Sequence, residues 1–187
     1  GTADTGDGSA PLNGSIDDVY VYGRALSQAE ITNLMNNVTV TSPALPSGTD
    51  LTVASGASLV LNSSNQTVGA LSGGNSGTIQ LGAGTTPTAL TFGKNSNTTF
   101  AGSITGNGSI TKSGGGKLSL ASAGYTGATQ VTAGTLDVNG TIASSGVTVS
   151  SGASLTGTGT VTNGVIIDGT AAPAGTGTGT LKVGSAA

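Results

Sequence analysis

The chain has few residues that could do chemistry. Its 187 residues include no histidine and no cysteine, which excludes catalytic dyads and triads built on either residue. Asp17 and Asp18 are neighbours in a predicted strand, so their carboxylates point to opposite faces and cannot flank one scissile bond. Further along, the acids Asp50, Asp137 and Asp168 are far apart in sequence. We therefore expect no catalytic residues and no enzymatic activity.

Two acids near the start are the candidate metal ligands. Asp4 and Asp7 lie in the glycine-rich segment DTGDG and could bind calcium through carboxylate oxygens. Their spacing does not match an EF-hand loop, and a polar turn is the alternative. Residues 114–117 (GGGK) are similar to a phosphate loop, but Leu118 stands where serine or threonine is required. We expect a turn there, and no cofactor apart from the calcium candidate.

The composition excludes two classes of partner. Charged residues make up 7% of the chain, against roughly 25% in an ordinary globular protein. The net charge is −3 and the five basic residues occur singly, which argues against binding to nucleic acid. No apolar run approaches the ~20 residues that span a bilayer, so we expect no membrane insertion.

The first 37 residues differ from the rest. Residues 15–22 alternate as a strand does, and a helix is predicted to follow over residues 28–36. Ser27 and Glu30 form a capping box at its start. Ile31 and Leu34 lie on one helical face, which we expect to cover the first turn of the following domain. The sequence thus predicts a strand plus capping helix over 1–37 and a second domain over 38–187.

From residue 38 onward the pattern is that of an all-β protein. Short strand-like segments about 8–12 residues apart alternate with Gly, Ser and Asn. Similar segments recur, such as LTVASGASL at 51–59 and VTVSSGASL at 147–155. Repetition of single strands favours a parallel β-helix, or β-solenoid, over a sandwich or barrel. With three strands per turn and a period of roughly 20–29 residues, about six turns are expected.

The alternation also predicts which side chains face the interior. Leu118, Leu120, Leu136 and Val138 alternate with Ser119 and Asp137, so the apolar set is expected to point inward. By the same reasoning an Asp137→Ser substitution is expected to matter little. Tyr125 is expected to pack over a corner as a structural residue rather than serve as an exposed platform for sugars.

Residues 100–140 resemble the autotransporter-associated β-strand repeat of bacterial surface and secreted proteins. The pattern is carried by Lys112, Gly114, Gly116, Leu118 and Leu120, then Tyr125, Gly127 and Thr129, then Gly134, Leu136 and Val138. This resemblance implies a right-handed β-helix of the passenger type, presented outside the cell. The segment GSIDDVYVYGRALSQAEITNLM resembles the last strand and helix of a laminin-G-like, concanavalin-type jelly roll, which implies that 1–37 is the remnant of such a domain.

Three functions follow from these observations in order of preference. The first is a non-enzymatic structural or adhesive β-solenoid at the cell surface, associating head to tail into filaments or binding partners at the cell surface or in the extracellular matrix. The second is a carbohydrate-binding surface module, inherited from the jelly-roll remnant. The third is a β-helix that degrades polysaccharides, which the scattered carboxylates disfavour.

Overall fold

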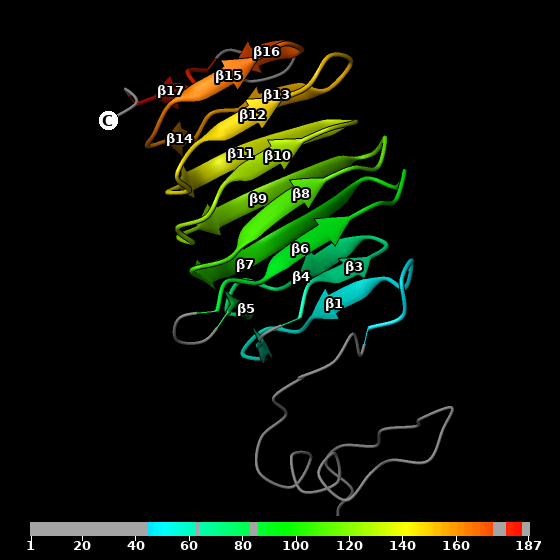
Figure 1. Ribbon diagram of the computed structural model, residues 1–187. Helices are drawn as coiled ribbons and strands as arrows, with labels where there is room; N and C mark the ends of the chain where they lie inside the picture. The colour runs from blue at the N-terminus through cyan, green and yellow to red at the C-terminus, as the bar shows by residue number, and fades with distance from the viewer. Residues whose placement is uncertain (1–44, 63, 83–85, 174–178, 185–187) are drawn as a thin grey trace, which may run out of the picture. The chain divides into compact units, whose positions relative to one another are not determined.

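The described part of the chain is a parallel β-solenoid. The computed structural model describes residues 45–62, 64–82, 86–173 and 179–184, all within the unit Val38–Ala187. These residues form about seven turns of strands, and no helix occurs among them (Figure 1). The fold class expected from the sequence is thereby confirmed, while the right-handed winding stays a prediction. Several predicted features lie outside the described residues: the strand 15–22, the helix 28–36, Asp4, Asp7, Ser27, Glu30, Ile31 and Leu34.

The strands stack in three columns, and all neighbours within a column run parallel. The first column contains Leu51–Val53 (β1), Leu71–Gly73 (β4), Thr98–Gly106 (β7), Lys117–Ala123 (β9), Thr135–Ile142 (β11), Ser154–Gly157 (β13) and Thr170–Pro173 (β16). The second contains Ser58–Leu61 (β2), Thr78–Leu81 (β5), the later halves of β7, β9 and β11, Thr160–Val161 (β14) and Lys182–Val183 (β17). The third contains Gln66–Val68 (β3), Ala89–Phe92 (β6), Ser109–Lys112 (β8), Thr129–Val131 (β10), Val147–Val149 (β12) and Val165–Ile167 (β15).

Several turns are shorter than the sequence suggested. In the middle of the solenoid Leu136 lies beside Leu118 and Leu155, which are 18 and 19 residues away along the chain. The strands β7, β9 and β11 pass from the first column into the second without a loop, and only a shift of register marks the corner. A corner made inside a strand needs few extra residues. For this reason about seven turns are present, where six were expected.

Apolar side chains fill the space between the columns. Leu118, Leu120, Leu136 and Val138 are 2%, 1%, 0% and 0% exposed. They belong to a continuous cluster that extends from Val53 to Val161. Because successive residues of a strand point to opposite faces, their polar neighbours are directed outward. Burial of a leucine side chain contributes roughly 1.5–3 kcal/mol, so this cluster is a major source of stability.

The two similar nine-residue segments do not occupy equivalent places. Residues 51–59 connect β1 to β2, from the first column to the second, whereas residues 147–155 connect β12 to β13, from the third column to the first. What they share is a tight corner closed by a backbone hydrogen bond of 3.1 and 3.0 Å respectively. Gly56 and Gly152 have φ of 80° and 79° there, values that glycine adopts without strain. The sequence similarity therefore marks the corner and not the period of the solenoid.

Substitution of an inward side chain by a charged one tests this register. Leu120→Asp places an unpaired carboxylate in the apolar interior, and we expect it to lower the free energy of unfolding by about 3–5 kcal/mol. Thr105→Asp is the matched control, because Thr105 is an exposed residue of β7. It should change stability by less than about 0.5 kcal/mol in urea unfolding. Equal losses from the two variants would show that the register is wrong.

Candidate functional site

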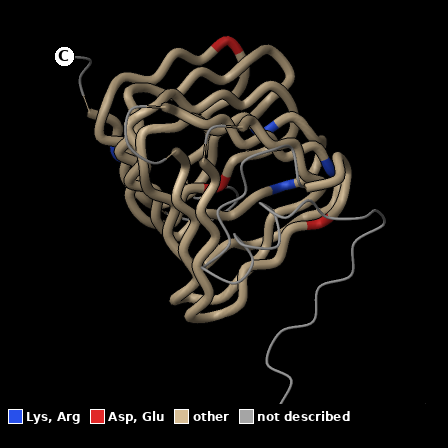
Figure 2. Tube along the Cα trace, turned by 60° about the horizontal axis from the view of Figure 1, so that its bottom comes forward, with Lys and Arg blue, Asp and Glu red and all other residues tan. Residues whose placement is uncertain are grey.

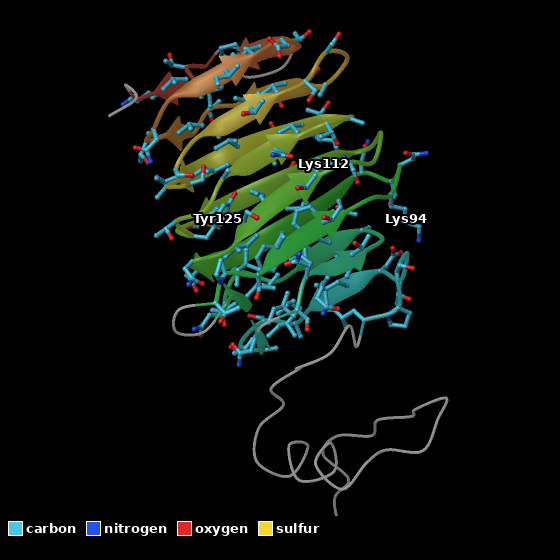
Figure 3. All side chains as sticks on the ribbon, in the orientation of Figure 1. Lys94, Lys112 and Tyr125 are labelled. Atoms are coloured by element: carbon cyan, nitrogen blue, oxygen red, sulfur yellow. The ribbon has the colours of Figure 1, made fainter. Side chains whose placement is uncertain are left out.

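Tyr125 is an interior residue and not a surface platform. Figure 3 labels Tyr125, which lies between β9 and β10 in the chain. It is 0% exposed, and its hydroxyl shares a hydrogen bond with Thr129 Oγ1. Burial raises the pKa of Tyr125, and the hydrogen bond with Thr129 opposes this effect. Such a phenol stays neutral and has no access to a ligand. Its role is to fill the corner, together with the inward Leu118, Leu120, Leu136 and Val138.

The acids of the described chain lie at separate levels of the solenoid. Asp50 precedes β1, Asp137 lies within β11 and Asp168 follows β15. Figure 2 shows how sparse the charged residues are along the stacked turns. Among the residues that the structure describes, no three His, Cys, Asp or Glu side chains come together as a metal site would require. Of the three, Asp50 and Asp137 each have their own set of partners.

At several corners a side-chain oxygen of one turn accepts a hydrogen bond from a backbone N–H of the next turn. The strand ladder is interrupted at these places, and a buried or half-buried N–H without an acceptor is costly. The acceptor is in each case a side-chain oxygen, 20–24 residues earlier in the chain and 2.7–2.9 Å away: Asp50 for Ala70, Asn65 for Ala89, Asn95 for Gly115 and Asn97 for Lys117. These corner acceptors extend hydrogen bonding between turns beyond the strands.

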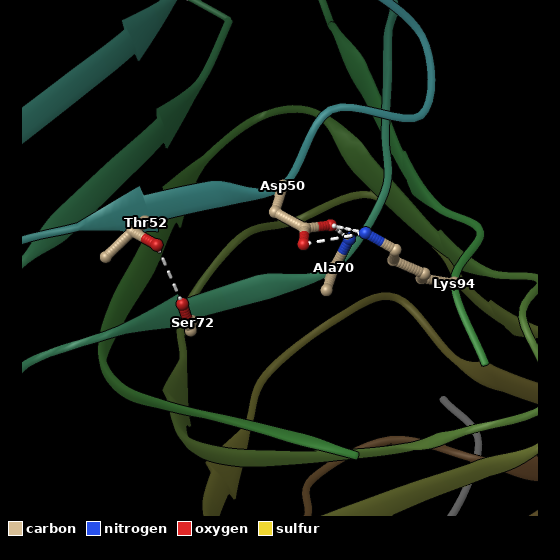
Figure 4. A network of polar contacts seen from close by, with 5 residues as sticks. All are labelled: Asp50, Thr52, Ala70, Ser72 and Lys94. Carbon is tan, nitrogen blue, oxygen red and sulfur yellow. Dashed lines mark hydrogen bonds and ion pairs between the residues drawn. The ribbon is translucent and has the colours of Figure 1, made fainter. Parts of the chain in front are cut away.

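The corner at Asp50 connects three turns (Figure 4). Asp50 Oδ1 accepts the N–H of Ala70, and both carboxylate oxygens lie 2.8–2.9 Å from Lys94 Nζ. The Lys94 hydrogen bond, followed by that of Ala70, lowers the pKa of Asp50. A Cβ at Gly69 would lie 2.5 Å from the backbone carbonyl oxygen of Gly48 and 2.5 Å from Asp50 Oδ1, so the turn requires glycine. The ion pair is half exposed, and such a pair on a surface contributes little stability of its own.

Asp137 connects three neighbouring strands on the outer side of the first column. Its Oδ2 accepts hydrogen bonds from Ser119 Oγ of β9 at 2.8 Å and from Asn139 Nδ2 at 3.0 Å. Its Oδ1 accepts one from Thr156 Oγ1 of β13 at 2.9 Å, and Lys117 Nζ lies 3.8 Å from Oδ2. Burial raises the pKa of Asp137, but the hydrogen bonds and the lysine outweigh this effect and the net shift is downward. The expectation that Asp137 is dispensable overlooked this network, since its two hydroxyl partners, Ser119 and Thr156, are 18 and 19 residues away.

Lys112 occupies an inward position that neighbouring turns fill with apolar side chains. In the third column it stands between Phe92 and Val131, and it is 3% exposed. Its Nζ donates hydrogen bonds to the carbonyl oxygens of Gly114 and Ala133. Burial lowers the pKa of Lys112. The ammonium group thus links two stacked corners through their carbonyls, a role that the sequence reasoning missed although the alternation after Ile110 places residue 112 inward.

A shallow hollow of about 540 Å³ opens along the third column. Small residues leave this space beside β10, β12 and β15. Its lining includes Ala128, Gly146, Thr148, Gly164 and Ile166, with no acidic or basic side chain. Without a titratable group the hollow offers no means of general acid–base catalysis.

The lowered pKa of Lys112 predicts a dependence of stability on alkaline pH. Between the folded-state pKa and the ordinary value of 10.5, the unfolded chain binds more protons than the folded one. The free energy of unfolding should therefore rise across this window, relative to that of Lys112→Met, which has no group to titrate. Urea unfolding of both proteins at several values of pH from neutral to 10.5 measures the difference. Parallel profiles would contradict a buried, charged Lys112.

The lowered pKa of Asp137 predicts a loss of stability at acidic pH. Because its pKa in the folded protein is below 3.8, its contribution is complete above that value and is lost as the pH falls through the folded-state pKa. Asp137→Asn should cost about 2 kcal/mol at neutral pH and flatten the loss of stability in acid. Thr156→Val, which removes one donor, should have a smaller effect of the same kind. Thr105→Val, outside the network, serves as the control in acid titrations monitored by circular dichroism.

One family model matches the chain. It is described as the passenger-associated-transport-repeat, and it covers residues 110–138. No curated protein and no solved structure gives a significant match. No helix long and apolar enough to cross a membrane occurs among the described residues. The matched segment extends from β8 to β11 and contains the Lys112 corner, Tyr125 and the inward leucines, so the chain carries an autotransporter-associated repeat within a parallel β-solenoid, which indicates a secreted or surface location.

Proposed function

We propose that this chain is a non-enzymatic, extracellular structural rod of the autotransporter passenger type. The observation that carries the proposal is the combination of the repeat at 110–138 with a ladder of parallel strands that continues through about seven turns. Several described polar side chains connect one turn to another: Asp50, Asn65, Asn95, Asn97, Lys112 and Asp137. A molecule whose polar side chains are occupied in this way is suited to hold a shape.

Two other functions are less well supported. A carbohydrate-binding surface usually offers exposed aromatic rings, whereas the aromatic residues in the described part of the chain, Phe92, Phe100 and Tyr125, are at most 2% exposed. Cleavage of a polysaccharide needs a pair of carboxylates about the scissile bond. The absence of histidine and cysteine from the sequence further restricts the available catalytic chemistry. We therefore favour the structural role over both.

The proposal includes head-to-tail association through the last described turn. Ile167 and Val183 stand in columns whose preceding members, Val149 and Val161, are 0% exposed. Yet Ile167 and Val183 are 41% and 50% exposed. A parallel turn supplied by a second copy would cover these side chains and pair with the strand edges beneath them. Such a contact joins unlike surfaces, so it extends into a filament unless the rotation closes a ring.

Sedimentation velocity over a range of concentrations tests the association. The intact chain should form species that grow with concentration, and the double variant Ile167→Lys/Val183→Lys should stay monomeric because its charges cannot be buried unpaired. Both residues are exposed, so the monomer should keep its melting temperature. Thr105→Lys, on an exposed position of β7, is the control and should assemble as the parent does.

A monomeric parent at every concentration would overturn head-to-tail association. A chain that starts at Val38 shows which part of the protein supplies the added strand. If assembly is lost only in that shorter chain, residues 1–37 donate the strand. If assembly survives, the contact is made by the turns themselves.

A further inference from the structure

The outward side of the third column presents one regular row of side chains. From β3 to β15 the row contains Thr67, Thr91, Thr111, Gln130, Thr148 and Ile166, each placed beside the next by the strand pairing. The pairings of this column contain no shift of register, in contrast to those of the first column. Four of the six positions are therefore threonines aligned along the axis, about 4.8 Å apart from strand to strand where they are adjacent. We call these six residues the threonine row.

The hydroxyl groups of the threonine row are not engaged by the protein. In the described part of the chain, Thr67, Thr91, Thr111 and Thr148 make no hydrogen bond through their side chains. On the outer side of the first column several hydroxyls are engaged, those of Thr52 and Ser72 with each other at 3.0 Å and those of Ser119 and Thr156 with Asp137. Each free threonine offers a donor, two acceptor lone pairs and a methyl group at a fixed place.

The surroundings of the row restrict what could bind to it. It carries no charge, so it cannot attract phosphates or charged peptides. It has no aromatic ring on which a sugar could stack. Its area is roughly 250 Å² from the strand spacing and rise, well below the ~800 Å² per partner that a stable protein complex buries. The partner that remains is a surface that repeats with the same spacing as the row. Hydroxyl and methyl groups alone can bind such a surface.

We propose that the threonine row binds the surface of ice. Along its hexagonal axes the oxygen lattice of ice repeats at a distance slightly shorter than the spacing of β-strands, so successive hydroxyls can meet successive lattice positions. The methyl groups order water between them, and the hydroxyls hydrogen-bond to it. The ladder beneath holds the side chains in place before contact, which reduces the entropy lost on binding. This inference goes beyond the structural role proposed above and does not depend on it.

Gln130 provides a gain-of-function test. It interrupts the threonines between Thr111 and Thr148 with a longer, flexible side chain. Gln130→Thr would give five consecutive threonines on β3, β6, β8, β10 and β12. We expect it to increase thermal hysteresis at least twofold over the wild-type chain, which should itself shape growing ice crystals and inhibit their recrystallisation.

Thr111→Tyr, at the middle of the row, should abolish crystal shaping because the ring holds the lattice away from the neighbouring hydroxyls. Thr105→Tyr makes the same change at an exposed position of β7 and should leave the activity unchanged. Circular dichroism melts of all variants verify that the fold is kept. Absence of ice shaping by both the wild type and Gln130→Thr, or equal losses in the two tyrosine variants, would overturn the proposal.

Discussion

The structure depends on the parallel backbone ladder that continues from one turn to the next. Each strand in the middle of a column pairs with the strand about one turn earlier and about one turn later, so the backbone groups of these strands are hydrogen-bonded to one another. The ladder also fixes the register of side chains. Once Leu118 is beside Leu136, the inward and outward sets of both strands are determined. The narrow apolar interior and the low charge content follow from this one constraint.

The constraint is most demanding at the corners, where strands end and the ladder is interrupted. The protein meets it with polar side chains that reach one turn forward, as Asn95 does to Gly115, and with the ammonium group of Lys112, which reaches carbonyls of two stacked corners. Glycine serves where a side chain would collide, as at Gly69 beneath Asp50. The abundance of Gly and Asn is therefore a consequence of corner geometry and not of disorder.

The outer surfaces divide into two kinds, and this division matters for function. On the first column, Asp137 and its partners tie β9, β11 and β13 together, so the hydroxyls of Ser119 and Thr156 are occupied by the protein itself. On the third column the threonine hydroxyls stay available to a partner. The exposed Ile167 and Val183 of the last described turn are a third kind of surface, since they continue columns that are buried below them. The binding and the assembly that we propose would therefore use different parts of one regular scaffold.

The sequence by itself determined the fold class and the local rules. Strict alternation around Leu118–Leu120 and Leu136–Val138 predicted buried strands, and degenerate repetition predicted stacking, because both patterns are short-range consequences of strand geometry. The motif around Lys112, Tyr125 and Leu136 led to the repeat family that residues 110–138 match.

The tertiary structure alone decided how the turns superpose. The segments 51–59 and 147–155 look equivalent in sequence yet lie between different columns, because a corner can be reused wherever the chain must bend. Likewise the length of a turn, and hence the partners of Asp137 and Lys112, depends on whether a corner is a loop or a shift within a strand. These contacts join residues about twenty positions apart, and local patterns do not encode which of several similar strands will meet.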